Sequence, residues 1–487
     1  MVSSIKKKYY SLPIQVKASF WFLICSFMQK GISSITTPIF TRLLTTEEYG
    51  NYNAFSSWLS VITIFVSLHL YSGVYTSGLV KFKEERKVFS SSLQGLSLLL
   101  TICWTIIYLM FRSFWNSLFN LTTIQMLAML VMIWASSAFN FWAAAQRVEY
   151  KYKALVIVTI IVSLLKPSLG VLFVINSEDK VTARILGLLL AELIGYTGLF
   201  ISQMKEGKVF FSNKFWKYSL LFNLPLVPHY LSQTILNSAD RIMIRDMVGA
   251  GQAGIYSLAY SVSQIMTIFN SSLTGAVSPW MYQKIKEKKI QAIANISYLT
   301  LSIIAIVNLL LICLAPEIIA IFAPPKYHEA IWVIPPVAMS VFFIFMYDYF
   351  ARFELYYEKT TFMMLASVLG ACLNVVLNYY FIQAFGYIAA GYTTLICYIF
   401  YVIAHYCMMR RICNKYHNGE KAFELKYLIL ISVAFICCGF LLMLTYQHMY
   451  LRYSLVFIFL VMCIIKKELI KKQIKRVLHL RKEAHTK

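Results

Sequence analysis

Charged residues are scarce in this chain. Only 14% of its 487 residues are Asp, Glu, Lys or Arg, whereas 59% are hydrophobic and the mean hydropathy is +0.65. Soluble domains carry roughly a quarter charged residues, so this composition excludes an ordinary soluble protein. A helix that crosses a bilayer needs about 20 mostly apolar residues, and runs of that length recur along the whole sequence. The composition therefore predicts an integral membrane protein.

The apolar runs predict an all-α polytopic membrane protein with about fourteen transmembrane helices. We expect these helices at 18–40, 52–80, 90–111, 123–144, 154–175, 183–204, 218–247, 253–279, 292–315, 328–350, 361–383, 386–408, 426–446 and 449–466.

Signatures of catalysis are also absent. The sequence has no HExxH, no DxD and no Gly-rich phosphate loop, and no connecting segment is long enough to fold into a soluble domain. This argues against a glycosyltransferase or polymerase with a catalytic loop, and against direct ATP hydrolysis. The ten cysteines lack CxxC spacing and lie almost entirely in apolar runs, which is typical of packing residues rather than of disulfides or zinc ligands. We expect no enzyme activity, no catalytic residue, no metal and no cofactor.

Acidic residues are few: 21 Asp and Glu against 45 Lys and Arg. The basic residues form no single patch that would fit nucleic acid. They cluster in alternate connections instead, as the positive-inside rule requires of cytoplasmic loops. Both termini are therefore predicted to be cytoplasmic, and the basic loops to contact anionic membrane lipids. The clusters are Lys6 to Lys8, "KFKEERK" from 81, "QRVEYKYK" from 146, "KEGKVFFSNKFWK" from 205, "YQKIKEKK" from 282, "RRICNKYHNGEK" from 410 and the tail from Lys466.

Two helix corners resemble each other. "TRLLTTEEYGNYNAFSS" from Thr41 and "IRDMVGAGQAGIYSLAYS" from Ile244 both place an Arg at a helix end, then a polar turn, then Gly-x-Tyr. A parallel repeat of six helices would explain this similarity. We therefore predict two pseudo-symmetric six-helix lobes, residues 1–210 and 211–415. Two further helices and a basic tail complete the chain over 416–487.

Two helices carry charges on a polar face. Lys30 lies near the middle of the first predicted helix, where its ammonium cannot easily reach an interface. In the seventh helix, Asp240 and Arg241 follow His229 along a polar stripe. Charges at that depth favour a water-filled cavity or the bundle interior. Similar stripes on the second and eighth helices predict one polar cavity lined by helices 1, 2, 7 and 8.

Two more deep charges have no obvious local partner. Lys166 precedes Pro167 midway along the fifth helix, and Glu192 lies deep in the sixth. We take Lys30, Lys166 and Arg241 as candidate substrate-binding cations. Asp240, Glu192 and His229 are candidate coupling or gating residues. Each deep charge could instead stabilise the helix bundle. For Asp348 and Arg352, spaced i,i+4, we favour such a local salt bridge.

The segments "LLTTEEYGNYNAFSSW", "AQRVEYKYKA" and "LNSADRIMIRDMVGAGQAGIYSLAYSVSQI" resemble bacterial polysaccharide repeat-unit flippases of the Wzx type. These belong to the multidrug/oligosaccharidyl-lipid/polysaccharide exporter superfamily. The resemblance implies a V-shaped pair of lobes in the bacterial plasma (inner) membrane, cycling between inward-open and outward-open states. The implied cargo is an undecaprenyl-diphosphate-linked glycan for O-antigen or capsule synthesis. A polysaccharide polymerase and a chain-length regulator are the implied partners. H⁺ and Na⁺ both remain open as coupling ions.

Three rival interpretations remain. A multidrug antiporter of the same superfamily would need an acid-rich site for cationic drugs, but the deep residues number three cations against two acids. A membrane enzyme acting on the same lipid-linked glycan would need an outer catalytic loop. A non-transporting scaffold would tolerate neutralisation of the deep charges.

Overall fold

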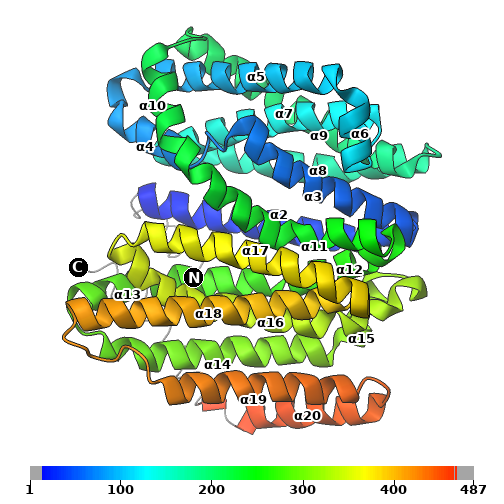
Figure 1. Cartoon of the computed structure of the whole chain (residues 1–487), viewed down its shortest axis with the longest axis vertical. Coiled ribbons are helices and arrows are strands. Elements are labelled where there is room, and N and C mark those ends of the chain that lie inside the picture. Colours follow the sequence, from blue (N-terminus) through cyan, green and yellow to red (C-terminus); the bar gives the residue numbers. More distant parts are fainter. Residues whose placement is uncertain (1–13, 466, 469–487) are drawn as a thin grey trace, which may run out of the picture. The chain divides into compact units, whose positions relative to one another are not determined.

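The computed structural model describes residues 14–465, 467 and 468, and within these residues it contains helices and no strand. The contacts divide the chain into two compact units, Met1–Ile242 and Met243–Lys487. Figure 1 shows the helices of each unit. The predicted all-α class is confirmed; the three-part division at residues 210 and 415 stays a prediction.

The first unit is formed by helices that follow one another through short turns. They are α2 (Ile14–Leu43), α3 (Thr46–Ser67), α4 (Gly73–Lys81), the 3-10 helix η1 (Lys83–Glu85), α5 (Arg86–Met110), α6 (Arg112–Phe119), α7 (Thr123–Val148), α8 (Tyr152–Ile175), α9 (Lys180–Gly207), α10 (Asn213–Asn223), η2 (Leu224–Leu226) and α11 (Val227–Met247), which continues into the second unit.

The second unit holds the remaining helices. They are α12 (Ala250–Ser263), α13 (Met266–Lys286), α14 (Gln291–Cys313), α15 (Ala315–Phe322), the 3-10 helix η3 (Pro325–Trp332), α16 (Ile334–Tyr356), α17 (Thr360–Phe385), α18 (Ala389–Tyr416), α19 (Leu425–Leu444) and α20 (Met449–Ile465). α16 packs against α12, α13, α14, α17, α18 and α19. Because it is surrounded, it is apolar on nearly every side.

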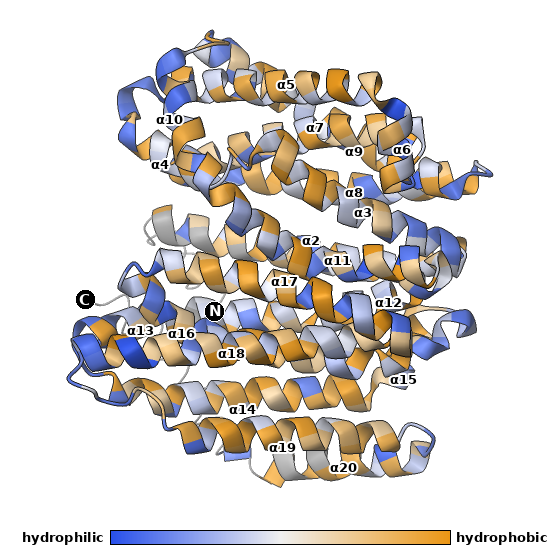
Figure 2. Cartoon of the chain, viewed as in Figure 1, coloured by the Kyte–Doolittle hydropathy of each residue, from blue (hydrophilic) through white to orange (hydrophobic). Residues whose placement is uncertain are grey.

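Nine helices in the described part of the chain are long and apolar enough to cross a membrane: α5, α7, α8, α9, α14, α16, α17, α18 and α19. Figure 2 shows hydrophobic residues along these helices and hydrophilic ones mainly at helix ends and turns. The predicted number of fourteen is not confirmed. The other five predicted spans coincide with α2 and with helices that are shorter or interrupted. Polar residues lower the hydropathy of α2. These are the same residues that predicted a polar face on this helix.

Each of the two similar corners joins consecutive helices, but the helix that follows the corner begins differently in the two cases. Thr45 caps α3, because its side chain accepts from the Glu48 amide while the Glu48 carboxylate accepts from the Thr45 amide. This is a capping box. At the second corner Gly249 precedes α12 with φ of 146°, a conformation that favours glycine. The 3-10 helix η2, which contains Pro225, separates α10 from α11.

Candidate functional site

Two predicted charges form one ion pair in the first unit. Lys166 Nζ lies 2.7 Å from Glu192 Oε1, joining α8 to α9. The Glu192 side chain is 7% exposed and that of Lys166 is 32% exposed. The sequence showed no local partner for either residue, and the structure supplies one 26 positions away on the adjacent helix. Their assigned roles stay predictions.

Small residues bring α8 and α9 close enough for this pair. A Cβ on Gly187 would lie 2.9 Å from the Gly170 Cα, and one on Gly195 would lie 2.3 Å from Val162 Cγ2. Glycines let helix backbones approach closely, which is the usual basis of tight packing in membranes. Lys166 lies between Val162 and Gly170 along α8, so the close contact surrounds it. Pro167 does not interrupt α8.

Aromatic rings flank the ion pair. The Lys166 ammonium lies 5.8 Å from the centre of the Tyr196 ring, and Tyr196 stacks on Phe139 of α7 at 4.5 Å. A cation near a ring face is attracted to it. Glu192 Oε2 is buried and has no hydrogen-bond partner among the residues that the structure describes. This oxygen can therefore bind a proton or a cation, or accept a hydrogen bond from a bound molecule.

Another cation, Arg184, belongs to the same unit and was missed by the sequence interpretation. Its guanidinium carbon lies 3.4 Å from the centre of the Tyr52 ring and 3.8 Å from that of Phe40. Arg184 is the fifth residue of α9, close to a predicted loop. Its position in the sequence therefore did not indicate a charge deep in the membrane. The contact with rings of α2 and α3 depends on tertiary packing that spacing alone does not reveal.

The remaining predicted residues lie on α2 and α11. Lys30 is exposed on α2, and Asp240 on α11 is 2% exposed. His229 and Arg241 are half-buried on α11. The roles proposed for these four residues stay predictions.

Hydroxyl groups on the predicted polar faces bond to their own helices. In α3, Ser56 donates to the Tyr52 carbonyl and Ser60 to the Ser56 carbonyl, at 3.1 and 2.9 Å. In α2, Ser34 donates to the Lys30 carbonyl at 3.0 Å. Such bonds satisfy a hydroxyl without water. These hydroxyls therefore do not by themselves require a water-filled cavity.

The predicted salt bridge in α16 is confirmed. Arg352 Nη2 lies 2.7 and 2.5 Å from the two carboxylate oxygens of Asp348. Thr274 of α13 donates a further hydrogen bond to Asp348 at 3.3 Å. Acid-first i,i+4 spacing places the two groups on one helix face, so local geometry was enough to predict the pair.

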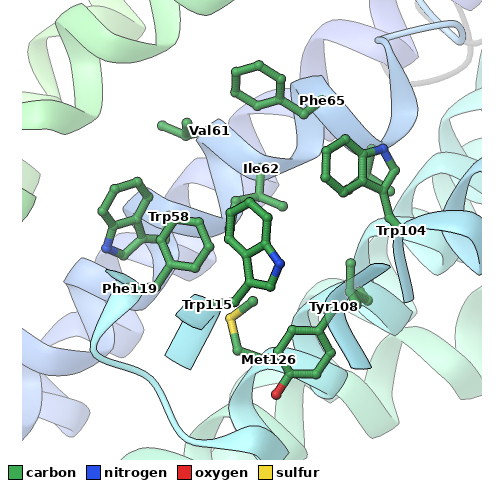
Figure 3. A pocket seen from close by; sticks show the side chains of 11 residues that line it. Trp58, Val61, Ile62, Phe65, Trp104, Tyr108, Trp115, Phe119 and Met126 are labelled. Carbon is green, nitrogen blue, oxygen red and sulfur yellow. The ribbon is translucent and has the colours of Figure 1, made fainter. Parts of the chain in front are cut away.

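The first unit also contains an apolar cavity of about 270 Å³ between α3, α5, α6 and α7. Figure 3 shows Trp115 in the middle of its lining, with Trp58 and Phe119 on one side and Trp104 and Tyr108 on the other. The Tyr108 hydroxyl donates to Asn116 at 2.9 Å. Since no charged group lines the cavity, it suits hydrocarbon and not a diphosphate.

Metal ligands do not gather in the part of the chain that the structure describes. No group of three or more His, Cys, Asp or Glu side chains there could hold a metal ion. The predicted absence of a cofactor stays a prediction.

Comparison with known families decides the affiliation. A family model described as "Polysaccharide biosynthesis protein" matches residues 16–285, more than half of the chain. The chain belongs to the polysaccharide biosynthesis protein family. A second model, MatE, matches residues 225–380. Both matches agree with the resemblance seen in the sequence.

Curated relatives of this family member come from Haemophilus influenzae. "Lsg locus putative protein 1" is 24% identical over 210 residues, 41% of this chain and 51% of that protein. The chain thus spans about half the length of this relative. An "uncharacterized membrane protein" is 20% identical over 373 residues, 73% of this chain and 87% of that protein.

Solved structures share the fold of this polysaccharide biosynthesis protein. A lipid II flippase, MurJ, in an inward-closed conformation is 16% identical with a TM-score of 0.69, covering 92% of this chain and 99% of MurJ. An outward-facing multidrug resistance MATE transporter of the MOP superfamily is 14% identical with a TM-score of 0.58, covering 82% and 96%. Family and fold together support the coarser prediction, a flippase or transporter of this superfamily.

Proposed function

We propose that this protein is a flippase that moves undecaprenyl-diphosphate-linked oligosaccharide repeat units from the cytoplasmic to the outer leaflet of the bacterial plasma membrane. The match of residues 16–285 to the polysaccharide biosynthesis family, on a fold shared with transporters, carries this proposal. The repeat units would serve O-antigen, capsule or another surface polymer. A polymerase and a chain-length regulator would then act on the delivered units.

Lys166 would bind the anionic end of the cargo. A Lys ammonium has three N–H donors, and Glu192 accepts from one of them at 2.7 Å. The other donors can bind phosphate oxygens through charge-assisted hydrogen bonds. Because a third of the Lys166 side chain is exposed, a ligand can reach it. Lys30 and Arg241 would add positive charge along the cargo path.

Glu192 would respond to cargo binding. When diphosphate oxygens compete for Lys166, the buried Glu192 carboxylate loses its counter-charge. An isolated buried carboxylate is costly, so Glu192 then favours uptake of a proton or Na⁺ at its partnerless Oε2. This exchange would link cargo binding to an ion gradient. Asp240 and His229 on α11 would serve in coupling or gating.

The deciding experiment uses a strain that lacks the gene. Undecaprenyl-linked oligosaccharides are extracted, their leaflet is determined, and surface polymer is quantified, with and without the wild-type gene on a plasmid. We expect complete repeat units on the cytoplasmic leaflet, loss of surface polymer, and recovery with the plasmid. Repeat units that reach the outer leaflet normally would overturn the proposal. Altered drug resistance in the same strain would then support the multidrug antiporter.

A further inference from the structure

The second unit contains a buried acid–base pair that lies outside the site described above. His405 Nδ1 on α18 is 2.9 Å from Oε1 and 2.8 Å from Oε2 of Glu354 on α16. The Glu354 side chain is 0% exposed and that of His405 is 3% exposed. Within the described part of the chain, no Lys or Arg forms a salt bridge with Glu354.

The protonation states of this pair differ in net charge. With a neutral imidazole and an ionised carboxylate, the pair holds one proton on the ring and carries a net charge of about −1. Addition of one proton gives either imidazolium with carboxylate or imidazole with carboxylic acid, and both are neutral overall. Because an uncompensated buried charge is costly, the closed surroundings favour the form with the added proton.

Aromatic rings surround His405. Tyr347 and Tyr401 stack on His405, with centroids 5.2 and 5.8 Å away and ring planes 24° and 21° apart. Phe362 of α17 meets the same ring edge-on at 5.7 Å. Aromatic faces attract a cation. The Tyr401 hydroxyl donates to the Ser367 carbonyl at 3.2 Å, so it does not compensate the Glu354 charge.

Other charged groups near the pair face elsewhere. Asp348 and Arg352 on α16 bond to each other. The Lys359 ammonium, at the start of α17, lies 5.8 Å from the centre of the Tyr416 ring. In the described part of the chain, the aromatic rings that contact His405 are those of Tyr347 on α16, Tyr401 on α18 and Phe362 on α17.

Glu354 lies close to the end of α16, whereas His405 lies 11 residues before the end of α18 at Tyr416. Glu354 is in the last turn of α16, which ends at Tyr356. Tyr357 then stacks on Tyr416 at 4.3 Å and its hydroxyl lies 2.9 Å from His417 Nε2, at the end of α18. Separation of the end of α16 from α18 would admit water to Glu354. Water stabilises the net negative form of the pair and so favours release of the proton.

We propose that Glu354 and His405 form a proton-binding site, and that this site couples transport to H⁺. The proton-binding part stands on the geometry alone. The coupling part rests on the proposed flippase function. One cycle would load a proton when the end of α16 is closed against α18 and release it when the two separate.

Proton binding can be tested without transport. The purified full chain in lipid bilayers is shifted between pH 8.5 and 5.5, and carboxyl and imidazole bands are recorded by infrared difference spectroscopy. We expect a protonation signal in the wild type that is lost in both Glu354→Gln and His405→Asn. Asp348→Asn, on the same helix, should keep it. Gel filtration verifies folding, and the second variant decides if the first does not fold. Wild-type spectra in both variants would overturn the site.

Coupling is tested on proteoliposomes that carry a polyprenyl-diphosphate-linked oligosaccharide. An imposed pH gradient should accelerate flipping by the wild type, and Glu354→Gln should lose that acceleration while Asp348→Asn keeps it. An unchanged response of Glu354→Gln would overturn the coupling role. Absence of flipping by the wild type under every condition would instead overturn the proposed function, while the infrared result would still decide the proton site.

Discussion

Lys166 and Glu192 neutralise each other across the contact between α8 and α9, with 2.7 Å between Nζ and Oε1. The Glu192 side chain is nearly buried and the Lys166 side chain is partly exposed. Removing one partner of such a pair has a different consequence from removing both, because only the first leaves a buried charge uncompensated. Comparing the single and double replacements therefore separates a structural role of the pair from a functional one.

Lys166→Met should therefore lower the free energy of unfolding by about 3 kcal/mol, whereas Lys166→Met with Glu192→Gln should recover most of that loss. Surface polymer should be lost in both, because neither offers a cation to the cargo. Thermal unfolding in detergent and quantification of the polymer measure the two effects. Full export by the double variant would contradict a substrate-binding role for Lys166. Arg352→Met is the control, expected to lower stability and retain export.

Lys30→Met should abolish export while membrane insertion stays normal. The Lys30 side chain is exposed on α2, so its replacement leaves no buried cavity that would destabilise the helix. Arg42→Met removes a cation from the same helix, one that bonds to the Pro38 carbonyl at 2.9 Å, and should retain export. Protein in the membrane fraction and surface polymer are measured together. Equal export by both variants would remove Lys30 from the cargo path.

Sequence patterns correctly predicted the features that depend on residues close together in the chain. Apolar run length identified the membrane helices, and i,i+4 spacing identified Asp348 with Arg352, whose geometry one helix determines. The number of membrane spans was harder, because polar residues and breaks in helices such as α2 and α11 blur the hydropathy that defines a span.

Contacts between distant helices were not predictable from spacing. Glu192 finds its partner 26 positions away, and Glu354 finds His405 51 positions away. The first pair depends on glycines that let α8 and α9 approach. A single sequence shows each glycine and each charge but not which helix faces which. The sequence interpretation therefore listed Lys166 and Glu192 separately and omitted Glu354 and His405.

His417 predicts a dependence of stability on pH. Burial lowers the pKa of His417, which follows the end of α18. The unfolded chain should then bind a proton at about pH 6.5, before the folded protein does. Stability is thus unaffected above that pH and falls as the pH decreases below it. Thermal unfolding from pH 8 to 5 should show this loss, and His417→Gln should reduce it. Equal pH profiles of the two proteins would contradict the prediction.

Gly370 determines how firmly Tyr401 is held beside His405. A Cβ at position 370 would lie 2.2 Å from Tyr401 Cε2 and 2.7 Å from its hydroxyl oxygen. Tyr401 is only 1% exposed, so its ring cannot move without displacing other core residues. Overpacking of this kind costs about 1 to 3 kcal/mol. We expect Gly370→Ala to lower the unfolding temperature and to alter the pH-dependent infrared signal of the Glu354–His405 pair.

The control for this substitution is Gly198→Ala in α9, where a Cβ would meet nothing within 4 Å. Alanine is favoured over glycine inside a helix by roughly 1 kcal/mol, so this variant should be as stable as the wild type or more stable. A loss of stability confined to Gly370→Ala would assign the effect to the contact with Tyr401. Equal stability of the two variants would mean that α17 and α18 separate easily, and the aromatic surroundings of His405 would then be too loose to favour one protonation state.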